Sequence, residues 1–196
     1  ITMDNTHYIS TELLSIETLE EIISHGKKLA LSEEATANIQ KCRAYLDKKM
    51  ASQSEAIYGI NTGFGSLCNV KISNENLSKL QENLVKSHAC GIGDEAPLSI
   101  VKLMLLLKIQ SLSYGHSGVQ LQTVERLIEF YNHDVLPVIY TQGSLGASGD
   151  LAPLAHLSLP LLGEGEVYYE GKKVHSIEVM KIFNWKPIVL QSKEGL

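Results

Sequence analysis

A glycine-rich turn around an Ala-Ser-Gly tripeptide constrains this chain more than any other stretch. Residues 143–150 read Gly-Ser-Leu-Gly-Ala-Ser-Gly-Asp and lead into an apolar helical pattern. Glycines stand at three-residue intervals, at Gly143, Gly146 and Gly149, and glycine adopts tight and left-handed turns at low cost. We therefore expect a tight turn followed at once by a helix with Asp150 at its N-terminus.

The tripeptide inside this turn is able to react with itself. The amide nitrogen of Gly149, unhindered by a side chain, can attack the carbonyl carbon of Ala147 and close a five-membered ring. Loss of one water, and then of the Ser148 hydroxyl as a second water, leaves a methylidene-imidazolone (MIO). This group is a strong electrophile built from the chain itself, without an external cofactor. The segment Ala147, Ser148 and Gly149 is therefore predicted to be an electrophilic catalytic centre.

Other uses of a glycine-rich turn fit this chain less well. A serine-hydrolase elbow, Gly-x-Ser-x-Gly, needs glycine where Asp150 stands. A phosphate-binding loop needs lysine and then serine or threonine after its last glycine, and Asp150 and Leu151 occupy those places. Residues 91–96 formally fit a dinucleotide fingerprint, but they follow a helical pattern and not a strand. We interpret them as a helix–helix turn.

Three blocks of sequence resemble the aromatic amino acid ammonia-lyases. They read GASGDLAPLAH at 146–156, YGINTGFG at 58–65 and QENLVKSHACGIG at 81–93, in the order of that family. The match is strongest to its histidine-selective members. It implies an MIO-dependent elimination of ammonia from L-histidine, giving trans-urocanate in histidine catabolism. The alternatives are a tyrosine or phenylalanine ammonia-lyase or aminomutase, or an inactive fragment of such an enzyme.

The same resemblance implies roles for individual side chains. Tyr58 is implied as the catalytic base, at the start of a loop that closes over the substrate. Loop closure would use three glycines, Gly59, Gly63 and Gly65. His88 is implied as the substrate-binding residue that hydrogen-bonds the imidazole ring, and a site built around such a bond rejects substrates that lack it.

Several other polar side chains have open interpretations. His156 either supports the glycine-rich turn at 143–149 (the reactive turn) or packs within its helix in the ordinary way. Three amides either anchor loop backbones or act as ordinary caps, namely Gln81, Asn83 and Gln142. Asn61 favours histidine as substrate, because the phenylalanine and tyrosine lyases that the chain resembles tend to have threonine there.

Composition limits the classes of function. Hydrophobic residues make up 44% and charged residues 20%, as in an ordinary globular protein. The net charge of −5 and the lack of a basic run argue against nucleic-acid binding. The strongest apolar run, 103–107, is far shorter than the ~20 residues that a membrane span needs. Cys42, Cys68 and Cys90 are widely spaced, which favours reduced thiols in the cytoplasm. The histidines and carboxylates form no cluster with ligand spacing, so no metal site is predicted.

The periodicity of apolar residues predicts a mainly α fold. Helices are expected over 18–25, 32–50, 73–89, 97–114, 121–131, 150–163 and 177–184. A small β-hairpin is expected over 167–174, with its turn at Glu170 and Gly171. By resemblance, residues 1–196 form the N-terminal MIO-bearing domain of the lyase fold, truncated before a C-terminal helical bundle. The resemblance also implies a homotetramer for the full-length enzyme, and we expect this piece alone to be uncyclised and inactive.

Overall fold

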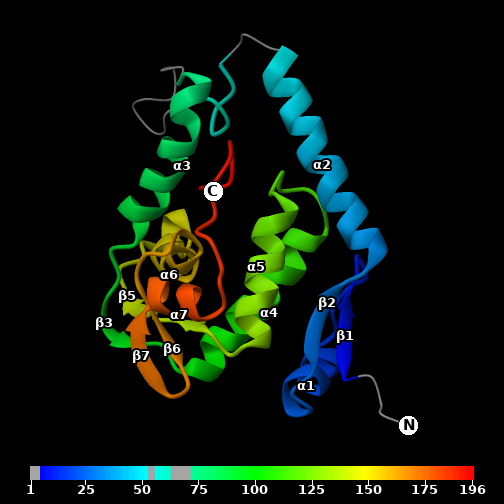
Figure 1. Cartoon of the computed structure of the whole chain (residues 1–196), viewed down its shortest axis with the longest axis vertical. Helices are drawn as coiled ribbons and strands as arrows, with labels where there is room; N and C mark the ends of the chain where they lie inside the picture. The colour runs from blue at the N-terminus through cyan, green and yellow to red at the C-terminus, as the bar shows by residue number, and fades with distance from the viewer. Residues whose placement is uncertain (1–4, 53–55, 63–71) are drawn as a thin grey trace.

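The chain folds mainly into helices, as expected. The computed structural model describes residues 5–52, 56–62 and 72–196 (Figure 1). The helices of this described part are α1 (Ile16–Ser24), α2 (Glu33–Ser52), α3 (Asn74–His88), α4 (Leu98–Ser113), α5 (Leu121–Asn132), α6 (Leu151–Ser158) and α7 (Ser176–Ile182). Its strands are short: β1 (Thr6–Ile9), β2 (Lys28–Leu31), β3 (Ile92–Glu95), β4 (Leu136–Pro137), β5 (Tyr140–Gln142), β6 (Glu166–Tyr169) and β7 (Lys172–His175).

Helix ends follow local capping chemistry. The Ser32 hydroxyl accepts the N–H of Ala35 at 3.1 Å and begins α2, as predicted. The prediction for α1 is wrong by one turn, because Ser15 is the cap and accepts the N–H of Thr18 at 3.2 Å. The helix predicted to reach residue 163 stops at Ser158 and tightens into a 3-10 turn around Pro160. Proline has no N–H and crowds the preceding turn, so it ends the α-helix.

A parallel pair of strands, β1 and β2, flanks α1 and was not predicted. Thr6 lies opposite Lys28, and Ile9 lies opposite Leu31. The Asn132 side chain at the end of α5 accepts the N–H of Leu29 at 2.8 Å and donates to its carbonyl at 2.9 Å. The strand edge is thus satisfied by an amide distant in sequence. Four-residue strands without turn signals carry too weak a local pattern to predict.

The other two sheets of the described part of the chain are antiparallel. The hairpin of β6 and β7 is confirmed, with φ of 48° at Glu170 and 72° at Gly171, and β4 pairs with its other edge. The interpretation of residues 91–96 as a helix–helix turn is wrong. These residues contain β3, which pairs with β5, and the Ala96 N–H donates to the Ile139 carbonyl at 2.8 Å. A distant partner strand made this segment extended.

The core forms where α4 packs against α5. The fully or nearly buried side chains there are Val101, Leu105, Leu106 and Ile109 of α4 and Val124, Leu127, Phe130 and Tyr131 of α5. Such burial of apolar surface is the main favourable term in folding. Helix α4 is almost wholly apolar and is buried along this side, whereas Ile100 and Leu107 are exposed.

The last residues of the chain return between α3 and α5 (Figure 1). Buried Arg43 of α2 donates to the Ser192 carbonyl at 3.0 Å and to the Gly118 carbonyl at 2.8 Å. The Gly195 N–H donates to the Gln81 side chain at 2.7 Å. Gln81 therefore anchors a backbone, which was one of its two open interpretations. These contacts place the C-terminal residues as a wall of the cavity described next.

Candidate active site

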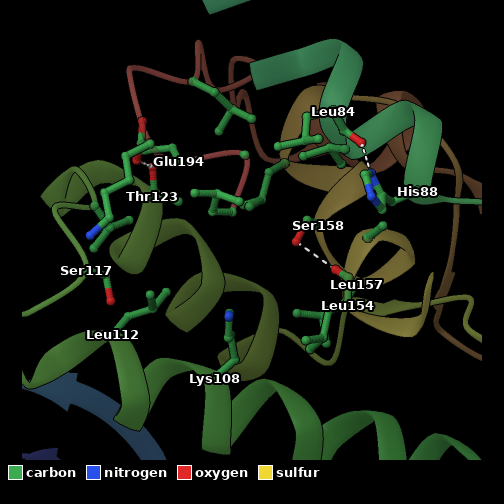
Figure 2. Close-up of a pocket in the computed structure, with 18 of the residues that line it drawn as sticks. Leu84, His88, Lys108, Leu112, Ser117, Thr123, Leu154, Leu157, Ser158 and Glu194 are labelled. Carbon is green, nitrogen blue, oxygen red and sulfur yellow. Dashed lines mark hydrogen bonds between the residues drawn. The ribbon is translucent and has the colours of Figure 1, made fainter. Parts of the chain in front are cut away.

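A cavity of about 650 Å³ lies between α3, α4, α5, α6 and the C-terminal segment (Figure 2). Its walls are mostly apolar, with leucines from all four helices. They include Leu84, Leu112, Leu127, Leu154 and Leu157, joined by Leu161 of the 3-10 turn after α6. Tyr58 and His88 both line this cavity, although they come from separate segments of the chain. The fold therefore brings the implied base and the implied substrate-binding residue to one space.

His88 is the last residue of α3, and its contacts define the state of its ring. Its Nδ1 lies 2.8 Å from the Leu84 carbonyl, one turn back (Figure 2). The same atom lies 3.2 Å from the Ser87 hydroxyl. A carbonyl oxygen only accepts, so Nδ1 carries the proton in this contact. In the neutral ring, the Nε2 atom then keeps a lone pair and is a hydrogen-bond acceptor.

Tyr58 is presented by a turn that two buried side chains hold together. The Asn61 side chain accepts the N–H of Ile57 at 2.6 Å, and the Thr62 hydroxyl accepts the N–H of Gly59 at 3.3 Å. Asn61 is 3% exposed, whereas Tyr58 is 62% exposed. Asn61 thus supports the loop from beneath. Two glycines predicted to let the loop close, Gly63 and Gly65, lie outside the described residues.

Lys108 also lines the cavity, although it was not among the residues predicted for the site. Its side chain points into the space from α4 (Figure 2). Burial lowers the pKa of Lys108, because removing an ammonium group from water disfavours its charged form. One sequence signal was available, since Lys108 directly follows the run of apolar residues at 103–107.

The reactive turn has the compact backbone that was expected. Residues Gly146–Ser148 form a 3-10 turn, and the Gly149 N–H donates back to the Gly146 carbonyl at 3.3 Å. Gly143 and Gly149 have φ of 128° and 87°, which only glycine adopts cheaply. Gly146 begins the 3-10 turn, but it does not have a positive φ, so the turn does not require glycine at this position. Of Ser148 only the backbone is described.

A family model and individual known proteins are both similar to this chain. The model of the family described as "Aromatic amino acid lyase" matches residues 14–196. A histidine ammonia-lyase of Legionella pneumophila (strain Paris) is 49% identical over 183 residues. The matched region is 93% of this chain and 36% of that protein.

The chain belongs to the aromatic amino acid lyase family.

Solved structures of the family show the same fold. The crystal structure of histidine ammonia-lyase from Trypanosoma cruzi superposes with a TM-score of 0.86 at 34% identity, over 97% of this chain and 36% of that one. Tyrosine aminomutase from Streptomyces globisporus superposes with a TM-score of 0.87 at 32% identity, over 96% of this chain and 35% of that one. The chain thus spans little more than a third of the length of these lyase-family relatives.

The block of lyase-like sequence at 146–156, the signature block, leads from the reactive turn into the cavity wall. Within the described part of the chain, the wall on this side begins at Leu151 and does not include Ala147 or Gly149. Asp150 stands before the first residue of α6 as predicted, but its side chain makes no capping hydrogen bond. Instead its carbonyl accepts the N–H of Leu154 at 3.4 Å.

His156 is the signature residue whose role was left open. Its Nε2 accepts the N–H of Gly91 at 2.9 Å, and its ring meets the ring of Tyr140 edge-on with centroids 5.3 Å apart. Burial lowers the pKa of His156. The side chain therefore joins α6 to the peptide that follows α3, which neither ordinary helix packing nor sequence spacing would have indicated.

Membrane-spanning helices and clusters of metal ligands are both absent from the part of the chain that the structure describes. Over residues 5–52, 56–62 and 72–196, no helix combines the length and the apolar character needed to cross a bilayer. Over the same residues, no three or more histidine, cysteine or acidic side chains gather as metal ligands would. Cys42 and Cys90 are free thiols, and Cys68 lies outside the described residues.

Proposed function

We propose that the full-length protein containing this chain is an L-histidine ammonia-lyase that converts L-histidine to trans-urocanate and ammonium. One observation carries the proposal. Tyr58 and His88 line one cavity, and its wall continues into the helix that starts directly after the reactive turn. The names of the relatives support the same substrate. A cytoplasmic homotetramer, with this chain as its N-terminal MIO-bearing domain, is part of the proposal and rests on the resemblance.

Recognition of histidine would follow from the state of the His88 ring. With Nδ1 bonded to the Leu84 carbonyl, Nε2 can accept a hydrogen bond from the N–H of a substrate imidazole. The leucine-rich walls suit the carbon atoms of that ring. A phenyl ring would fill the space but would leave a partly buried acceptor unpaired, which costs binding energy.

The reaction needs an electrophile, because the β-proton of an amino acid is too weakly acidic for a base alone to remove at neutral pH. The MIO group, when formed from Ala147, Ser148 and Gly149, supplies it and makes ammonia a better leaving group. The residues present fit that group. The 3-10 turn folds the Gly149 amide back along the chain, and, apart from its chain neighbours, no described residue has an atom within 4 Å of where a Cβ on Gly149 would stand.

Tyr58 is proposed as the base: its phenolic oxygen, in the deprotonated form, takes the β-proton and becomes the phenol. The buried Asn61 and Thr62 fix the turn that carries it, so its ring is held at the cavity from a defined backbone. Holding base and substrate in a fixed geometry contributes to the rate by removing the need to bring them together.

A tyrosine aminomutase is the second candidate, because its solved structure superposes with a TM-score of 0.87. Product analysis separates the two candidates. Purified full-length protein is incubated with L-histidine and, separately, with L-tyrosine. Faster formation of urocanate from L-histidine supports the proposal, whereas faster turnover of L-tyrosine or formation of a β-amino acid contradicts it.

Replacement of the reactive serine tests the proposal directly. Ser148→Ala in the full-length protein should abolish activity and keep the circular dichroism spectrum, because no methylidene forms without a β-hydroxyl. Ser144→Ala, in the same exposed stretch, is the matched control and should remain active. The intact mass of the parent should be lower than the plain sequence by two water molecules. An undiminished parent mass, or substantial turnover by Ser148→Ala, would remove the central claim.

The isolated 196-residue piece offers a further check. Strain in a reactive backbone persists only where surrounding structure enforces it. Ala147 and Gly149 are exposed here. We therefore expect the separately expressed piece to keep the plain mass and to lack activity, whereas a mass lower by two waters would show that this piece suffices for cyclisation.

A further inference from the structure

We propose that His156 is a positioning residue that fixes the reactive turn against the peptide following His88. The inference rests on the proposed function, since it concerns how the electrophile at residues 147–149 is placed relative to the substrate-binding His88. It acts through backbone contacts on both sides of the turn. The contacting atoms belong to the described residues and need no bound ligand.

The first contact joins α6 to the end of α3. The Gly91 N–H donates to His156 Nε2 at 2.9 Å, and Gly91 stands three residues after His88. A Cβ added at Gly91 would lie 2.9 Å from that same Nε2 and 3.1 Å from the Tyr140 Cβ. The ring of His156 can approach this closely only because residue 91 has no side chain. This contact therefore fixes the position of α6 relative to the peptide that follows His88.

The second contact lies on the other side of the reactive turn. A Cβ added at Gly143 would lie 3.0 Å from the Gly91 Cα and 3.2 Å from the Cys90 carbonyl oxygen. Gly143 therefore touches the same peptide that His156 bonds. Between these two points, a Cβ added at Gly146 or Gly149 would meet no atom of the described residues within 4 Å, apart from those of its own turn and chain neighbours. The turn is held at its two ends, on one shared peptide.

The chemistry of the first contact defines what residue 156 must supply. A backbone N–H only donates, so His156 Nε2 must hold a lone pair and Nδ1 must hold the proton. Position 156 thus requires a hydrogen-bond acceptor at the reach of a histidine ring. Glutamine retains an acceptor of similar reach. Phenylalanine keeps an aromatic ring beside Tyr140 but offers no acceptor.

The test compares these two substitutions in the full-length protein. His156→Gln, His156→Phe and the parent are measured for kcat and KM on L-histidine and for hydrogen–deuterium exchange of peptides covering 88–95 and 142–150. His133→Phe is the matched control, because His133 ends α5 against Phe183 and makes no part of the proposed site. The exchange measurement is independent of activity.

Loss of the acceptor should loosen both peptides and slow the chemistry. In His156→Phe, we expect exchange of both peptides to be about fivefold faster, as for loss of one hydrogen bond. We expect kcat to fall on the order of 10–100-fold with little change in KM, because misplacement affects the reaction more than binding. His156→Gln should recover most of both, and His133→Phe should match the parent.

Three results would overturn the inference. The first is parent-like exchange and kcat in His156→Phe, and the second is a His156→Gln variant as impaired as His156→Phe. If His156→Phe does not fold, Gly91→Ala replaces it, because the added Cβ pushes the His156 ring away from the other side. Parent-like exchange of peptide 142–150 in Gly91→Ala is the third result that would overturn the inference. An inactive parent with plain mass would refute the proposed function instead, and the exchange comparison would still decide the role of His156.

Discussion

The three glycines of the reactive turn should respond very differently to alanine, although they are evenly spaced in the sequence. Gly143 has a φ of 128°, and a Cβ there would stand 3.0 Å from the Gly91 Cα. Gly146 does not have a positive φ, and a Cβ added there would meet no atom of the described residues within 4 Å beyond its own turn. Gly149 has a φ of 87° but open space around it. The three sites therefore separate backbone strain from steric contact.

The expected magnitudes follow from these two terms. At Gly143, holding a non-glycine residue at this φ costs about 1–3 kcal/mol and forcing a methyl group against backbone costs about 1–3 kcal/mol, so Gly143→Ala should cost about 2–6 kcal/mol. Gly149→Ala carries only the first term, about 1–3 kcal/mol. Gly146→Ala should be neutral or stabilise by up to about 1 kcal/mol, because alanine restricts the unfolded chain. A loss of several kcal/mol is a large share of a stability of about 5–15 kcal/mol.

Urea unfolding of the 196-residue chain measures these differences. Trp185 is the sole tryptophan and stacks on Phe183 with ring centroids 4.4 Å apart, so its fluorescence reports unfolding of the core around α5 and α7. The order of destabilisation should be Gly143→Ala, then Gly149→Ala, then Gly146→Ala. A neutral Gly143→Ala, or a Gly146→Ala as damaging as Gly143→Ala, would refute this account of the turn.

Other predictions concern substrate, pH and the core. His88→Leu in the full-length enzyme should lower kcat/KM for L-histidine and raise acceptance of L-phenylalanine, and an unchanged ratio of the two would place ring recognition elsewhere. Burial lowers the pKa of His156 below its unfolded value of 6.5, so the unfolded chain binds more protons at this residue than the folded chain does. The contribution of His156 to the free energy of unfolding should be complete above about pH 6.5 and should fall as the pH drops toward the folded pKa. Urea titrations should show less of this fall in His156→Gln. Arg43→Met should cost about 2–5 kcal/mol in urea unfolding, because it leaves the Gly118 and Ser192 carbonyls without their buried donor; a loss under 1 kcal/mol would mean that water replaces the guanidinium.

Local chemistry explains what could be predicted from the residues alone. The Ser32 cap, the apolar run that became α4 and the Glu170–Gly171 turn are each decided within a few neighbouring residues. The reactivity assigned to Ala147–Gly149 is local in the same sense, because it involves consecutive peptide groups. Such features can be predicted from the sequence because the atoms that cause them are close along the chain.

Long-range partners decided the remainder. Strand β3 exists because β5 lies beside it, and β1 pairs with β2 across a helix. Tyr58 and His88 line one cavity only because the packed helices bring their two segments to it. His156 could be seen in the sequence, but its partner Gly91 could not, since the bond joins residues 65 positions apart. A residue's type limits which bonds it can make, whereas the packed chain decides which donor or acceptor stands within reach.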